Sequence, residues 1–144
     1  MNDETEPMTV VEAMATFHER LLLNQSVAFH VASMPPGTVA VIGIMTDPEC
    51  LQCGIFSINN PGGKAFENFR ALLKFRNMCR DAAVKSGFTR VQVTGFEFSN
   101  ARLKDIFQRQ GYDEQVTIPC PAEFGDGTMN GLGKTFVILN GELA

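Results

Sequence analysis

GGKAFENFRALLKFRNMCRDAAVKSGFTRVQVTGFEFSNARLKDIFQRQGY, residues 62–112, is the stretch that decides the fold of this 144-residue chain. It begins with the glycine pair Gly62-Gly63, and a long run with apolar residues at every third or fourth position follows. That spacing is typical of a helix that turns one broad apolar face to a core. The helix is expected to end at Ser86-Gly87. Its apolar positions are Phe66, Phe69, Leu72, Leu73, Cys79, Ala82 and Ala83.

A strand and a second, shorter helix complete this stretch. Residues 90–98 predict a strand, with Val91 and Val93 on one face. Asn100 opens the second helix, and Gly111 ends it, because glycine adopts the left-handed conformation just past a helix at little cost. The predicted order is therefore glycine loop, helix, strand, helix.

The part of the chain before this stretch predicts one helix and three strands. Residues 10–23 have one apolar face, and Thr9 followed by Glu12 is a capping-box pattern at the start of a helix. Short turns then separate three apolar, partly β-branched segments, which predict an antiparallel meander. The three strands are residues 27–32, 39–45 and 54–58.

The last third of the chain predicts two further strands, residues 115–118 and 134–139. The glycine-rich residues 124–133 between them predict either a mobile hairpin loop or a segment that closes over a ligand. Residues 1–7 are expected to be a disordered lead-in, and residues 8–144 one domain. The fold class is α/β in the α+β sense, with a mixed, mostly antiparallel sheet flanked by helices.

Composition narrows the classes of function. A formal charge of −4 argues against broad nucleic-acid binding, and no apolar run is long enough to span a bilayer. The acidic start of the chain is unlike a secretory signal, so a cytoplasmic protein is expected, without membrane or nucleic-acid partners. Basic residues collect along residues 64–85, which indicates a solvated helix face or a local anion site.

The four cysteines do not form a metal-binding pattern. Cys50 and Cys53 make a lone CxxC, whereas Cys79 faces the apolar side of a predicted helix and Cys120 lies between two prolines. A structural zinc site needs two more ligands at matched spacing. A redox CxxC starts a helix, and this one precedes a predicted strand. We therefore expect no metal site.

The order of these elements resembles the GCN5-related N-acetyltransferase (GNAT) family. The most specific match is the second central helix, where that family commonly has Asn, six residues, Tyr, three residues, Gly and an aromatic residue. This chain has Asn100, Phe107, Gly111 and Tyr112 at that spacing. The resemblance covers residues 54–118 well and the remainder by element order alone. It implies a GNAT-like fold whose first strand is missing.

The resemblance also implies a binding loop for the pyrophosphate of acetyl-CoA or coenzyme A. The family loop reads Arg or Gln, two residues, Gly, one residue, then Gly or Ala, and residues 60–65 match it with Asn in the first place. Glycine lets backbone N–H groups turn toward phosphate oxygens, and the helix behind adds its positive end. A glycine turn that only starts a helix is the alternative. The implied cofactor residues are Phe56, Ile58, Asn60, Gly62, Gly63, Lys64, Ala65, Asn100 and Phe107.

The chain departs from the family at its catalytic positions. Phe107 stands where many members have a tyrosine that protonates the departing thiolate. The usual carboxylate base is absent from residues 52–58, so Asp47 and Glu49 before that strand and Glu97 at the end of the next are the carboxylate candidates. His30 is a further candidate base, because imidazole titrates near neutral pH, although a structural histidine is the alternative.

Two functions from different classes follow. The first is an acetyl-CoA-dependent N-acetyltransferase, in which a small-molecule or protein amine attacks the thioester directly and a backbone N–H near Phe56 or Ile58 polarises its carbonyl. The second is a GNAT-like structural or binding protein without catalysis, since short members of this kind occur among phage virion and accessory proteins. The sequence leaves the acceptor and the formation of a homodimer open.

Overall fold

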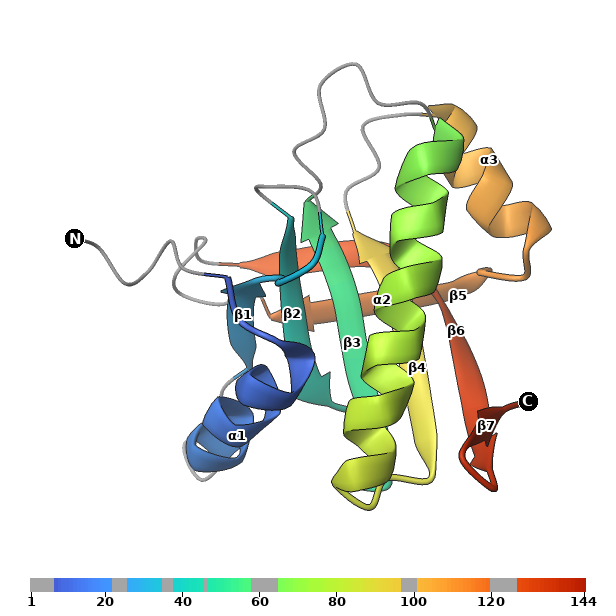
Figure 1. Ribbon diagram of the computed structural model, residues 1–144. Coiled ribbons are helices and arrows are strands. Elements are labelled where there is room, and N and C mark those ends of the chain that lie inside the picture. The colour runs from blue at the N-terminus through green and yellow to red at the C-terminus, as the bar shows by residue number, and fades with distance from the viewer. Residues whose placement is uncertain are drawn as a thin grey trace.

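The computed structural model describes residues 7–21, 26–34, 38–45, 47–57, 65–96, 101–119 and 127–144. In these residues, three helices flank one seven-stranded sheet (Figure 1). The sheet order is β1-β2-β3-β4-β6-β5, with β7 paired to β6. The elements are α1 (Val10–Leu21), β1 (Val27–His30), β2 (Val39–Ile44), β3 (Cys50–Ser57), α2 (Ala65–Lys85), β4 (Arg90–Phe96), α3 (Ala101–Arg109), β5 (Glu114–Pro119), β6 (Thr128–Leu139) and β7 (Glu142–Leu143).

The pairing of the strands confirms the predicted architecture. Strands β1, β2 and β3 form an antiparallel meander, and β3 and β4 are parallel. Helix α2 makes the long crossover that a parallel pair requires. Strands β4, β6 and β5 then pair antiparallel. The mixed, mostly antiparallel sheet is the one expected from the GNAT resemblance.

Met8, which lies just before α1, is bridged to the sheet. Met8 is bridged in parallel to Val31, and its N–H donates to the His30 carbonyl at 2.8 Å. Its own carbonyl accepts from Ala32 N–H, also at 2.8 Å. Within the described residues no strand precedes α1, as expected, and residues 1–6 lie outside them.

The main core lies between the sheet and the two helices α1 and α2, which cover the same face (Figure 1). Helix α2 contributes the predicted stripe, with Phe69, Leu72 and Cys79 fully or almost fully buried. Phe75, which the predicted stripe omitted, is also fully buried. Every second residue of β3 and β4 faces this core, because side chains alternate between the two faces of a strand. The apolar side chains on this face therefore pack against the helices that cover it.

A second, smaller core lies on the opposite face of the sheet. Val41 in β2 and Phe96 at the end of β4 pack there against Val116 and Ile118 of β5 and Met129 of β6. These contacts form because the C-terminal end of β5 and the N-terminal end of β6 cross behind the meander of β1, β2 and β3 (Figure 1). The sheet therefore covers part of its own second face, where no described helix lies.

Strand β6 corrects the prediction of a loop at residues 124–133. Thr128 to Gly133 belong to a twelve-residue strand, and residues 124–126 lie outside the described part. The glycines are there for close approach: a Cβ on Gly133 would lie 2.6 Å from Thr94 Oγ1, and one on Gly131 would overlap the Gly95 carbonyl oxygen. Glycine in this strand thus marks tight packing rather than a turn.

The helix ends follow the sequence signals. Thr9 and Glu12 form a reciprocal capping box, in which Glu12 N–H donates to Thr9 Oγ1 at 3.1 Å and Thr9 N–H to Glu12 Oε1 at 3.3 Å. Gly87 and Gly111, past the ends of α2 and α3, have φ angles of 83° and 90°. Both glycines adopt the left-handed conformation, which the sequence predicted for Gly111, and both helices end where predicted.

Thr9→Ala is expected to lower the free energy of unfolding by about 1 kcal/mol, because the Glu12 N–H loses its acceptor. Urea denaturation measures the change. Thr16→Ala is the matched control, since the Thr16 hydroxyl donates only to a carbonyl already within the helix, that of Glu12, at 3.3 Å. Equal losses for the two variants would contradict a capping role for Thr9.

Candidate functional site

The parallel strands β3 and β4 separate at their carboxyl ends. Their last paired residues are Ile55 and Gly95. Beyond that point Ser57 stays paired with Val39 of β2, while Phe96 stays paired with Gly131 of β6. Each strand therefore follows its outer neighbour. In open sheets, ligands bind beyond the carboxyl ends of parallel strands at such a change of direction.

A bulge in β3 lies at the same place. Ser57 is opposite Val39 and Ile55 is opposite Ala40, so Phe56 between them is opposite no residue of β2. The extra residue of a bulge is left out of the ladder of backbone hydrogen bonds. Phe56 therefore lies at an irregularity in the pairing of β2 with β3, beside the point where β3 and β4 separate.

Two helices begin at this end of the sheet. α2 starts at Ala65 and α3 at Ala101, and both first turns lie at the edge where β3 and β4 end (Figure 1). The unpaired N–H groups and the dipole of a helix N-terminus favour negative charge. The carboxyl ends of β3 and β4 therefore lie at the same end of the sheet as two helix N-termini, which favour negative charge, and the bulge in β3.

The predicted pyrophosphate loop connects β3 to α2. Asn60, Gly62, Gly63 and Lys64 lie outside the described residues, as do Ile58 and Asn100. Ala65 is the first residue of α2. Ser57, the last residue of β3, and Ala65 are the described residues on either side of this loop.

The described residues include three of the candidate bases, His30, Asp47 and Glu49. His30 ends β1 and is paired with Val39, which is paired in turn with Ser57. That places half-buried His30 two strand spacings, about 10 Å, from the end of β3. Glu97 directly follows Phe96 and lies outside the described residues.

Glu49 lies at the opposite end of β3. It is exposed, its backbone N–H donates to Asp47 Oδ1 at 2.9 Å, and its carbonyl accepts from Thr89 and Arg90. Six residue steps of extended chain separate Glu49 from Ile55, a span of about 20 Å. Glu49 is therefore not brought together with the diverging ends, and we do not assign it a role there.

Phe107 and Tyr112 are both buried, as predicted, with 3% and 2% of their surface exposed. Their ring centroids are 5.4 Å apart, and Phe107 is 5.5 Å from Phe69 of α2. Burial raises the pKa of Tyr112, and the nearby Arg76 opposes that shift. Tyr112 packs at 6.3 Å from Phe136, which is paired with Val91 near the start of β4. Its ring therefore lies away from the diverging ends and does not replace the missing tyrosine.

The CxxC lies inside β3, not before it as predicted, because β3 begins at Cys50. Cys50 and Cys53 are both buried. Burial, with Cys53 next in importance, raises the pKa of the Cys50 thiol to about 11. Reactive redox thiols have lowered pKa values instead. Among the residues described, no group of three or more His, Cys, Asp or Glu residues could hold a metal ion.

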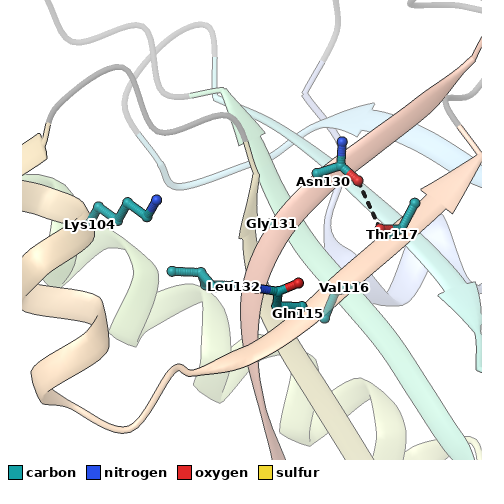
Figure 2. A pocket seen from close by; sticks show the side chains of 7 residues that line it. All are labelled: Lys104, Gln115, Val116, Thr117, Asn130, Gly131 and Leu132. Atoms are coloured by element: carbon teal, nitrogen blue, oxygen red, sulfur yellow. Dashed lines mark hydrogen bonds between the residues drawn. The ribbon is translucent and has the colours of Figure 1, made fainter.

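A cavity that the sequence did not reveal lies between α3 and the strands β5 and β6 (Figure 2). Its volume is about 340 Å³. Lys104 reaches toward it from the first turn of α3, and the strands contribute Gln115, Thr117, Asn130 and Leu132. Thr117 donates a hydrogen bond of 2.8 Å to Asn130 Oδ1. Only the register of β5 against β6 brings these side chains together, so no local sequence pattern could have predicted the cavity.

The helices in the described part of the chain are too short or too polar to cross a membrane.

Comparison with known proteins adds little to this geometry. No family model matches the sequence, and no curated protein matches it. Among solved structures, the chain is similar to a proposed ribosomal-protein-serine acetyltransferase from Vibrio cholerae, with a TM-score of 0.39 and 12% sequence identity. The match covers 88% of this chain and 72% of that one. A likeness at this level carries no argument about function, which therefore depends on the strand geometry.

Proposed function

We propose that the chain is an acetyl-CoA-dependent N-acetyltransferase in which an amine attacks the thioester directly. The observation that carries the proposal is the separation of β3 and β4 after Ile55 and Gly95, together with the bulge at Phe56. This arrangement leaves room in the hydrogen-bond ladder for an extended ligand at the carboxyl ends of two parallel strands. The GNAT resemblance of residues 54–118 gives the class of ligand.

The residues at this edge fit acetyl-CoA in three respects. Gly62, Gly63 and Lys64 precede α2, whose N-terminus favours a pyrophosphate. The Phe56 N–H lies at the irregularity in the pairing of β2 with β3 and could polarise a carbonyl beside β3. His30, about 10 Å from the end of β3, could take the proton of an amine only through intervening water. Bound acetyl-CoA would supply the activated acetyl group.

The chain provides no hydroxyl where many family members have their acid. Phe107 is packed between Phe69 and Tyr112 and has no proton to give. In this proposal water protonates the thiolate of coenzyme A as it departs. The thiolate is a weaker base than the attacking amine. Positioning and electrostatic stabilisation then account for most of the rate.

Phe107→Tyr is expected to leave the rate of acetyl transfer unchanged or to raise it, because it supplies the missing hydroxyl at the family position. Initial rates of coenzyme A release with a fixed amine measure the effect. Circular dichroism checks the fold, since a hydroxyl added at a residue 3% exposed costs stability unless it finds a partner. A large loss of activity in a folded variant would contradict the assignment of this position.

Thermal melting with and without acetyl-CoA tests the proposal most directly. At a hundred times its dissociation constant, a ligand adds about 2.7 kcal/mol to the stability of the native state. For a domain of this length that corresponds to a rise in Tm of roughly 5–10 °C. Desulfo-coenzyme A should give a similar rise, because it keeps the pyrophosphate. Absence of a shift with both ligands would contradict cofactor binding.

A second function is favoured by the aromatic packing of Phe107. Phe107 has no proton to donate, and its ring packs against those of Phe69 and Tyr112. Such a position suits a GNAT-like structural or binding protein without catalysis. Absence of a shift in the same melting experiment would favour this second function over acetyl transfer. Cofactor binding without turnover of any amine would also favour it.

A further inference from the structure

We propose that the cavity between α3 and the strands β5 and β6 binds the carboxylate of the acceptor, so that the substrates are amines that also carry a carboxylate. The inference depends on the proposed acetyl transfer for the role of the amine. The carboxylate site itself stands on the described side chains alone.

The lining of the cavity is suited to an anion. Lys104 is the one charged residue among the described residues that line it, and its side chain reaches from α3 toward the strands (Figure 2). Asn130 accepts from Thr117 through Oδ1, which leaves its amide NH₂ group to donate. Gln115 has a second amide in the same lining. An ammonium group and two amides from three elements make a donor set that matches the oxygens of a carboxylate.

The cavity lies on the same row of the sheet as the point where β3 and β4 separate. Ile55 of β3 is paired with Gly95 of β4, Gly95 with Leu132 of β6, and Leu132 with Gln115 of β5. Paired residues point to the same face of a sheet. Gly95 adds no side chain to this row, whereas Ile55 is buried in the main core beneath α2. An acceptor would therefore reach β3 past the carboxyl ends of the strands and not across the covered face.

Distance and volume limit the size of the acceptor. β6 and β3 are two strand spacings apart, about 10 Å, so the amine must be several carbons away from the carboxylate. A volume of about 340 Å³ is at the small end of the range for ligand pockets. The inferred class is therefore small ω-amino acids, or a lysine-like side chain with a nearby carboxylate.

A matched pair of amines tests this class. 6-Aminohexanoate and 1-aminohexane have the same amine and chain length, and only the first has a carboxylate. With the purified full chain and saturating acetyl-CoA, kcat/KM for 6-aminohexanoate should exceed that for 1-aminohexane by up to about fivefold, the factor expected for a charge contact made by exposed side chains. Glycine should be a poor substrate, because its amine is too near the carboxylate to reach β3.

Two substitutions in the cavity should lower this preference for 6-aminohexanoate to different extents. Lys104→Gln should remove most of it by raising KM for 6-aminohexanoate, with 1-aminohexane unaffected. Asn130→Asp keeps the acceptor for the Thr117 hydroxyl but adds a negative charge, so it should reverse the preference. Lys85→Gln, at the far end of α2, is the control for loss of a surface charge and should change neither rate.

Binding measurements separate failure of this inference from failure of the proposed function. The Kd for acetyl-CoA should be the same in the parent and in Lys104→Gln; a clear rise in the variant would show that Lys104 holds a cofactor phosphate and would overturn the inference. Titration with propionate should shift the NMR signals of the Gln115 and Asn130 side-chain amides. If these signals do not move, the carboxylate site is wrong even when acetyl-CoA binds. If they move but acetyl-CoA does not bind, the carboxylate site stands and its assignment to an acetylated acceptor is overturned.

Discussion

Gly131→Ala is expected to destabilise the protein by about 3 kcal/mol or more, the largest effect we expect from adding a single methyl group. A Cβ at this position would overlap the Gly95 carbonyl oxygen and lie 2.8 Å from Phe96 Cδ1 and 2.9 Å from Thr94 Cγ2. The first of these atoms is backbone in the adjacent strand, so it cannot move without breaking the pairing of β4 with β6. Urea denaturation of the parent and the variant measures the loss.

Gly43→Ala is the control for this prediction, because Gly43 is also a buried strand glycine. A Cβ there would lie 3.1 Å from the hydroxyl oxygen of Ser26, a flexible side chain that can turn aside. We expect a loss of less than about 1 kcal/mol for this variant. Similar losses for Gly43→Ala and Gly131→Ala would show that the close approach of β4 and β6 is not what requires glycine.

Gly63→Asp is expected to abolish binding of coenzyme A if the loop before α2 cradles a pyrophosphate. The substitution adds a side chain and a negative charge where backbone N–H groups must meet phosphate oxygens. Isothermal titration calorimetry measures the loss, and circular dichroism with thermal melting checks the fold. A folded variant that binds coenzyme A as well as the parent would show that the phosphates lie elsewhere.

Lys64→Ala should weaken coenzyme A binding less than Gly63→Asp does, because it removes a charge and leaves the backbone donors in place. The difference in Kd between Lys64→Ala and the parent should shrink as salt is raised, since ions screen exposed charges beyond roughly 8 Å at physiological ionic strength. Lys85→Ala at the other end of α2 is the matched control and should bind like the parent. A loss that is independent of salt would argue against a charge contact.

Local chemistry in the sequence was enough to predict most of the elements. The Thr9 and Glu12 pair marked the start of α1, and Gly87 and Gly111 marked the ends of α2 and α3, because caps depend on residues within one turn of the helix. The parallel pairing of β3 and β4 was also predictable. A long helix between two strands allows a parallel neighbour, whereas a short turn allows an antiparallel one.

Tertiary structure alone decided where β3 and β4 separate and which residues lie near that point. Gly131 and Gly133 read as loop residues because glycine favours turns, and only the closeness of β4 shows why they belong to a strand. Glu49 is near β3 in sequence yet about 20 Å from its carboxyl end, because an extended strand carries its two ends apart.

The bulge at Phe56 and the cavity beside Lys104 depend on register, which pairs residues far apart in the chain. The sequence by itself thus determined most of the elements, their order and the direction of their pairing, since these follow from contacts between near neighbours. The position of the diverging strands and the set of side chains in the cavity required the folded sheet. Both arise from pairings between segments tens of residues apart, on which no local pattern reports.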